Sequence, residues 1–134
     1  MKQKLHVFLR IVIAIILLQT LRFKLTAHPD SVFIFTMAGM EPYGRIAIGV
    51  LELIFAVLLI FPKTAWIGSF GTLGIISGAI FLHLTKIGIE VLGDSGLLFY
   101  TALFVFAGSF FILWNERKNI FWGKYRKKLE INKL

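Results

Sequence analysis

The stretch GRIAIGVLELIFAVLLIF, residues 44–61, decides the class of fold. Apart from Arg45 and Glu52, its residues are glycine, alanine or large apolar types. A helix rises about 1.5 Å per residue, so about 18 residues nearly span a hydrocarbon core of about 30 Å. Pro62 directly follows the stretch and ends it. We therefore predict a transmembrane helix here, with a carboxyl group near its middle.

Three further segments have a similar length and apolar character, at about residues 5–23, 65–85 and 97–114. The whole chain of 134 residues is 57% hydrophobic and 16% charged, whereas soluble domains are roughly a quarter charged. Barrel strands would alternate apolar and polar residues, but these segments are apolar on all sides. The predicted fold is all-α, a polytopic membrane protein built as a four-transmembrane-helix bundle.

The first segment has a basic start, which is also typical of a signal peptide. Arg10 interrupts its apolar region, and the sequence Arg22-Phe23-Lys24 follows where a cleavage site would need small residues. We expect a retained helix, with a cleaved signal as the alternative.

The connection from Lys24 to Tyr43 contains a second predicted element. His28-Pro29-Asp30-Ser31 resembles a helix cap, and the apolar residues 32–37 follow it. We expect a short helix at the membrane surface, with a hydrophobic loop packed on the bundle as an equal alternative. Residues 1–115 then form one transmembrane domain, and residues 116–134 form a basic tail.

The basic residues predict the orientation of the bundle. An even number of spans places both termini on one side, and that side collects ten basic residues: Lys2, Lys4, Lys63, Arg117, Lys118, Lys124, Arg126, Lys127, Lys128 and Lys133. The opposite side has four: Arg22, Lys24, Arg45 and Lys86. This excess predicts cytoplasmic termini. The net charge of +8 is explained by topology and by contacts of the tail with anionic lipid headgroups, so we expect no nucleic-acid partner.

Glu52 is the leading candidate for a functional residue, because a carboxylate inside a membrane costs several kcal/mol unless it is paired, protonated or hydrated. Helix arithmetic places it about 12 Å below the outer surface. We expect a polar pocket that opens outward and is lined by five residues: Gln19, Arg22, Arg45, Glu52 and His83. The alternative is a buried pair that only fixes the register of the helices.

Other residue types exclude several kinds of chemistry. The chain has no cysteine, which excludes disulfides and iron–sulfur clusters. His6 and His28 are poorly placed to join His83 as a second axial ligand, so no haem is expected, and we predict no metal site. Four glycines in the third segment predict close helix packing: Gly68, Gly71, Gly74 and Gly78.

Taken together, these features resemble the DoxX-like family of small bacterial four-helix membrane proteins. The resemblance covers about residues 5–115 and depends on the order of Arg10, Lys24, Gly49-x-x-Glu52-Leu53, Pro62 and His83. It implies a location in the bacterial cytoplasmic membrane and a role as an accessory or anchor subunit of a quinone-linked redox system. It also implies that Glu52 and His83 contact a quinone or a proton.

Two functions of different classes follow from these expectations. The first is the redox accessory subunit, with a redox protein or further copies of the chain as candidate partners. The alternative is a small proton-coupled transporter or a module that binds a lipid or another small molecule. An autonomous enzyme is least expected, because we find no complete nucleophile–base or metal constellation.

Overall fold

The computed structural model describes residues 2–133, except for the side chains of residues 2–3 and 118–128. The helices are α1 (Lys2–Leu25), α2 (Pro29–Met37), α3 (Tyr43–Ile60), α4 (Ala65–Leu82), a π-helical turn (His83–Ile87) and α5 (Leu97–Asn132). No strand occurs between residues 2 and 133. Four segments are long and apolar enough to cross a membrane: Lys4–Leu25, Tyr43–Ile60, Ala65–Ile87 and Leu97–Arg117. The predicted all-α four-helix membrane protein is confirmed.

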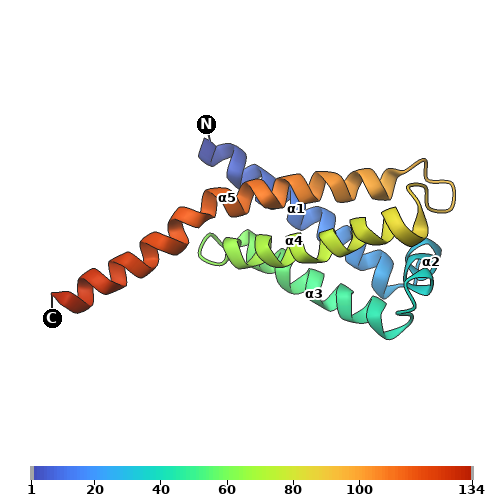
Figure 1. Ribbon diagram of the computed structural model, residues 1–134, viewed down its shortest axis with the longest axis horizontal. Coiled ribbons are helices and arrows are strands. Elements are labelled where there is room, and N and C mark those ends of the chain that lie inside the picture. Colours follow the sequence, from blue (N-terminus) through green and yellow to red (C-terminus); the bar gives the residue numbers. More distant parts are fainter. Residues whose placement is uncertain (1, 134) are drawn as a thin grey trace.

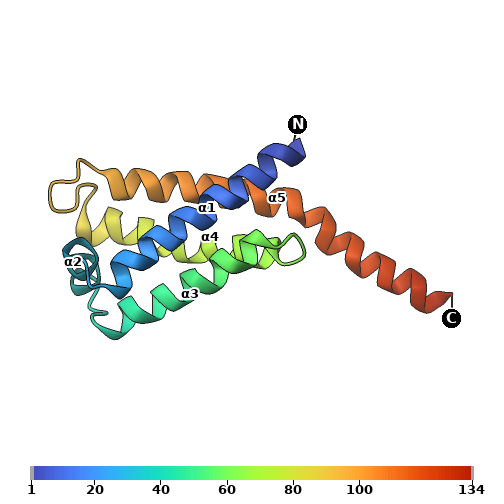
Figure 2. The same ribbon diagram turned by 180° about the vertical axis from the view of Figure 1, so that it is seen from behind.

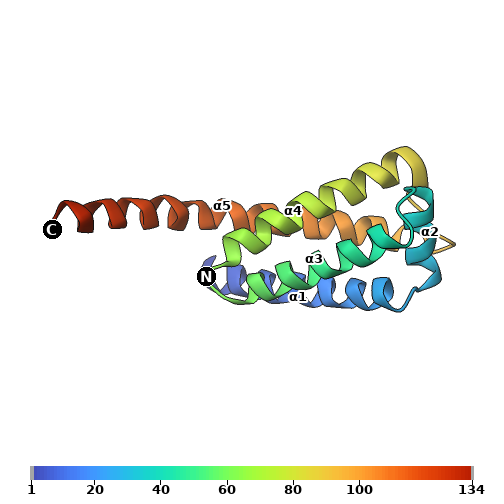
Figure 3. The same ribbon diagram turned by 90° about the horizontal axis from the view of Figure 1, so that it is seen from below.

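The bundle consists of two pairs of helices. α1 packs along α3, and α4 packs along α5, while α3 joins the pairs through its contact with α4 (Figure 1; Figure 2). α1 also meets α5, over a less extensive contact. Seen from below, α3 and α4 lie close together near their connecting turn and separate toward the other end, where α2 lies (Figure 3). We call these the turn end and the α2 end of the bundle.

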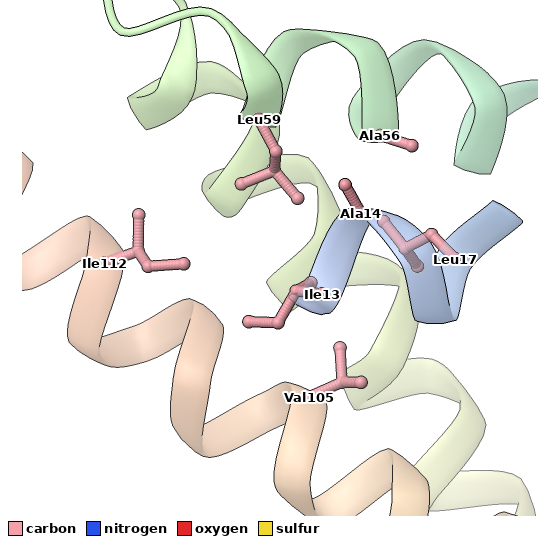
Figure 4. Packing of buried hydrophobic residues seen from close by; sticks show 7 residues of the cluster. All are labelled: Ile13, Ala14, Leu17, Ala56, Leu59, Val105 and Ile112. Atoms are coloured by element: carbon pink, nitrogen blue, oxygen red, sulfur yellow. The ribbon is translucent and has the colours of Figure 1, made fainter. Parts of the chain in front are cut away.

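The hydrophobic core fills the part of the bundle toward the turn end. It is formed by buried side chains from α1, α3 and α5 that point toward one another: Ile13, Ala14, Leu17, Ala56, Leu59, Val105 and Ile112 (Figure 4). At the same level α5 approaches α1 closely, because a Cβ on Gly108 would lie 2.7 Å from the side chain of Ile13. The two helix pairs are therefore held firmly together at this end.

Two arginines bind the ends of neighbouring helices. Arg10 of α1 donates to the backbone carbonyls of Leu59 (2.8 Å) and Ile60 (2.6 Å), the last residues of α3. Arg45 of α3 donates to the carbonyl of Lys24 near the end of α1 and to Glu41 Oε1 at 2.7 Å. The carbonyls at a helix C-terminus lack partners within the helix and carry partial negative charge. Each of these antiparallel helices thus supplies a cation to the C-terminus of the other.

The short helix predicted between the first two spans is confirmed as α2. Its start is capped by His28, whose Nδ1 accepts from the backbone N–H of Asp30 at 3.2 Å, and Pro29 occupies the first helical position. Ser31 and Phe35 are its buried residues. α2 crosses the end of the bundle at which α3 and α4 separate (Figure 3).

α5 extends far beyond the expected end of the fourth span. It continues as one helix to Asn132 and projects from the turn end of the bundle (Figure 1). The basic tail predicted for residues 116–134 is thus largely a continuation of this helix. The predicted contacts of the tail with lipid headgroups fall mainly on side chains 118–128, which lie outside the described residues.

Candidate functional site

A cavity of about 590 Å³ occupies the half of the bundle toward the α2 end. One wall comes from α1 and α3, the other comes from α4, the π-turn and α5, and α2 contributes the residues at its end. Most lining residues are apolar. The polar lining residues are Thr20, Lys24, Asp30, Ser31, Glu52, His83 and Thr101. The separation of the helix pairs therefore produces a space of the size that small ligands occupy.

Glu52 lies on the buried face of α3 and is 5% exposed. Its Oε1 is 3.1 Å from Lys24 Nζ, so α1 supplies the positive charge that compensates the carboxylate. Its Oε2 is 3.2 Å from the hydroxyl of Thr20. That hydroxyl also lies 3.0 Å from the carbonyl of Leu17, and its single proton serves one acceptor at a time. Lys24, Thr20 and Glu52 all line the cavity.

Gly49 explains how Lys24 reaches Glu52. A Cβ on Gly49 would lie 3.3 Å from the side chain of Leu21 and 3.5 Å from Cβ of Lys24. The absence of a side chain therefore lets α1 approach α3 closely at this level. Glu52 lies three residues further along α3, on the neighbouring part of the same face. The spacing Gly-x-x-Glu thus brings the two helices together and places a carboxylate one turn below the contact.

Three of the predicted pocket residues lie elsewhere. Gln19 and Arg22 are exposed on α1, and Arg45 is buried but binds Glu41 and the carbonyl of Lys24 instead of lining the cavity. The predicted pocket was therefore wrong in these three positions. The position of a residue along a helix gives its depth in the membrane but not the side of the helix on which it lies. Consecutive residues point in directions that differ by about 100°. Thr20, the residue next to Gln19, points toward α3 and contacts Glu52.

His83 is 4% exposed and lies on the opposite wall of the cavity from Glu52. Its Nδ1 is 2.8 Å from the carbonyl of Gly88, and its own carbonyl accepts from the N–H of Gly88 at 2.8 Å. A carbonyl can only accept, so Nδ1 carries a proton and neutral His83 keeps a lone pair on Nε2. The ring also packs edge-on against Phe99, with centroids 5.5 Å apart. In the described contacts Glu52 binds Lys24 and Thr20 and does not contact His83.

The π-turn that holds His83 was not predicted. It closes at Gly88, whose φ of 86° and ψ of 176° are accessible almost only to glycine. π-helical turns are often found at functional sites. Here a backbone bond between His83 and Gly88 closes the turn, and a second bond, from Nδ1 to the carbonyl of Gly88, holds the imidazole.

The four glycines of α4 divide into two pairs. A Cβ on Gly68 would lie 2.8 Å from the backbone nitrogen of Leu59, and one on Gly71 would collide with the ring of Phe55. These two glycines pack against α3, as expected. Gly74 and Gly78 have nothing within 4 Å of an added Cβ and line the cavity, so they make no such close contact with another helix of this chain.

Fold and cavity together define the class: a four-helix membrane protein with a ligand-sized cavity in one half and a packed core in the other. Among the side chains that the structure describes, no three metal-ligating groups lie together. Comparisons with protein-family models, with curated proteins and with solved structures find no match for this chain.

Proposed function

We propose that the protein is a membrane-embedded binding subunit whose cavity holds one lipid-soluble molecule with a polar head, in the first place a quinone. The observation that supports this most is the ion pair of Lys24 and Glu52, buried at the edge of a cavity that is otherwise mainly apolar. A site of this composition suits an amphipathic molecule, since the few polar groups can orient its head while the apolar walls bind the rest.

The side chains around the cavity can serve both redox forms of a quinone. Lys24 has three N–H donors, of which Glu52 engages one, so another can donate to a quinone carbonyl. On the opposite wall, neutral His83 has an acceptor at Nε2 that suits the hydroxyl of a quinol. The chain has no cysteine with which to bind an iron–sulfur cluster, so electrons would come from a partner protein. This supports an accessory or anchor subunit of a membrane redox complex, as the DoxX-like resemblance implies.

The closed half of the bundle supports binding over transport. The core side chains Ile13, Leu59 and Ile112 are fully buried, and Arg10 joins α1 to the end of α3 beyond them. A transported molecule would have to pass this packed layer. A proton-coupled transporter is therefore the second candidate, and only the buried carboxylate of Glu52 favours it.

The same proposal includes a location and an orientation. The excess of basic residues on the side of the termini favours cytoplasmic termini in a bacterial inner membrane. The α2 end, and with it the cavity, would then face the outside of the cell.

The decisive experiment is gentle purification from the native membrane, followed by identification of the accompanying lipids, quinones and proteins. Glu52→Gln is compared with wild type and with Glu90→Gln, which makes the same change at an exposed residue outside the cavity. We expect a quinone, and a redox protein with it, to be lost from Glu52→Gln alone. Unchanged contents in all three samples would reject the proposal and leave Glu52 as a residue that fixes helix register.

A second variant protects this test against misfolding. Glu52→Gln leaves the ammonium of Lys24 without its partner, whereas Lys24→Gln combined with Glu52→Gln removes both charges at once. If the single variant does not fold, the double variant replaces it in the same comparison.

A further inference from the structure

The two helix pairs meet along two seams, one between α1 and α5 and one between α3 and α4, and the cavity lies between the pairs. On the seam between α1 and α5, the cavity-lining residues Leu17, Ala102 and Val105 are buried. On the seam between α3 and α4, the lining residues Gly74 and Gly78 are exposed. Gly74 and Gly78 line the cavity and are exposed, whereas Leu17, Ala102 and Val105 line it and are buried, so the cavity is more open along the second seam than at these residues of the first.

The register of the two helices shows where this opening begins. Gly71 of α4 packs against the ring of Phe55 of α3. Seven residues make nearly two full helical turns. Gly78 therefore lies on the same face of α4 as Gly71, and Ile48 on the same face of α3 as Phe55, both two turns closer to the α2 end. Both line the cavity, yet an added Cβ on Gly78 would meet nothing within 4 Å. The helices therefore touch at Gly71 and are separated at Gly78.

The opening lies within the hydrocarbon region of the bilayer. Gly74 and Gly78 are each two residues from the midpoint of the span Ala65–Ile87, or about 3 Å along the helix. The hydrocarbon core is about 30 Å thick, so the opening is at the level of the lipid tails. Lys24 and Glu52 hold their ion pair inside the cavity.

We propose that the gap between α3 and α4 at Gly74 and Gly78 is a lateral portal through which the long apolar chain of the bound molecule extends into the leaflet. This inference rests on the proposed function and adds the class of ligand. The ligand is a single-chain amphiphile whose head lies at Lys24 and Glu52 and whose chain is longer than the cavity. The two glycines leave room for this chain, because any larger side chain there would fill the gap.

The test compares two quinone probes that share a head group. Decylubiquinone has a ten-carbon chain, and the parent dimethoxy-methyl-benzoquinone has none. Their affinities for the purified protein are measured through ligand-dependent thermal shifts in detergent. A leucine at position 78 would displace two or three buried methylenes, so we expect Gly78→Leu to weaken decylubiquinone binding roughly tenfold or more while the parent compound binds as before.

The matched control is Ser77→Leu. Ser77 is the neighbouring residue on α4, is exposed, and does not line the cavity, so we expect this variant to bind both probes like wild type. Gly78→Leu should fold, since the site is open and leucine is a better helix former than glycine. Gly78→Ala should give a smaller effect in the same direction.

Several outcomes would overturn the portal. Equal weakening of both probes by Gly78→Leu, or no effect on either, would reject it while leaving the proposed function intact. Failure of the wild-type protein to bind either probe would reject the proposed quinone site, and the portal with it. Gly74 and Gly78 also have the spacing of a helix dimer motif. If Gly78→Leu lowers the mass of the purified complex to that of a monomer, a second copy of the chain occupies the gap and the portal is rejected.

Discussion

Lys24 and Glu52 form an ion pair inside the bundle, in which each side chain compensates the charge of the other. The Lys24 side chain is 15% exposed and that of Glu52 is 6% exposed, so water compensates neither charge fully. Removing one partner of a buried pair leaves the other charge uncompensated, whereas removing both together lowers the free energy of unfolding far less. The energetics of this pair therefore depend on whether the two residues are changed singly or together.

We predict strongly non-additive effects in a double-mutant cycle of Lys24→Gln and Glu52→Gln. Each single change should lower the free energy of unfolding by about 3–5 kcal/mol, since it leaves one buried charge without a partner. The double variant should lose less than either single variant. Thermal unfolding in detergent measures all four proteins. Additive losses would show that the two side chains act independently and would contradict the pairing.

The sequence predicted Glu52 as the central polar residue but did not predict its partners. An intramembrane carboxylate can be recognised from the sequence alone, because a charged residue within an apolar segment is rare and has to be compensated in some way. Its partners depend on how α1 is rotated about its axis, and that rotation is set by packing at Gly49 and Leu21. Thr20 therefore replaced the predicted Gln19, and Lys24 proved to be the direct partner.

Among the elements, the loop before α5 depends on a single carboxylate. Asp94 Oδ1 accepts from the N–H groups of Gly96 (2.8 Å) and Val91 (2.9 Å), and its Oδ2 accepts from that of Leu98 (3.1 Å). Burial would raise the pKa of Asp94, but these three donors outweigh burial and hold its pKa below the ordinary value of 3.8.

We predict that Asp94 makes the bundle sensitive to acid. Because its pKa is lower in the folded protein than in the unfolded one, its stabilisation is fully present above about pH 4 and is lost as the pH falls through the folded value. Asp94→Asn should cost about 0.5–2 kcal/mol at pH 7, because a neutral amide replaces a charged carboxylate that accepts three backbone hydrogen bonds. It should also flatten the fall of the melting temperature below pH 4. Melting curves from pH 7 to pH 3 measure both effects.

Glu90→Gln is the control for this prediction, because Glu90 is an exposed carboxylate close to the same loop. It should follow the wild-type curve. If Asp94→Asn runs parallel to wild type at every pH, the hydrogen bonds to Asp94 do not contribute to the acid response.

The apolar elements could be predicted from the sequence, but the π-turn could not. Length and hydropathy determine which segments can cross a membrane, and these properties are local. At the change from α4 to the π-turn, the ring and the carbonyl of His83 both bond to Gly88, and the ring packs on Phe99 of α5. The contact with Phe99 is tertiary and is not visible in the local sequence. For the same reason the glycines of α4 looked alike in the sequence, although only Gly68 and Gly71 lie where α3 is close.

The whole molecule resembles a wedge, packed at the turn end and open at the α2 end (Figure 3). The bonds of Arg10 and the hydrophobic core hold the packed end, while α2 and the π-turn lie at the open end. Because of this asymmetry, the cavity lies nearer to one side of the membrane than to the other. Which side this is determines whether the cavity meets molecules from outside the cell or from the cytoplasm.

We predict that the open end faces outward, and the absence of cysteine makes this directly testable. Lys63→Cys places a thiol in the exposed turn at the packed end, and Glu90→Cys places one in the exposed loop at the open end. In intact spheroplasts, a membrane-impermeant maleimide should label Glu90→Cys, and it should label Lys63→Cys only after permeabilisation. This follows from the ten basic residues on the side of the termini against four on the other. The reverse labelling pattern would place the cavity on the cytoplasmic side. The fold and the ion pair would not be affected by that result. Any redox partner would then have to be a protein that delivers electrons from the cytoplasm.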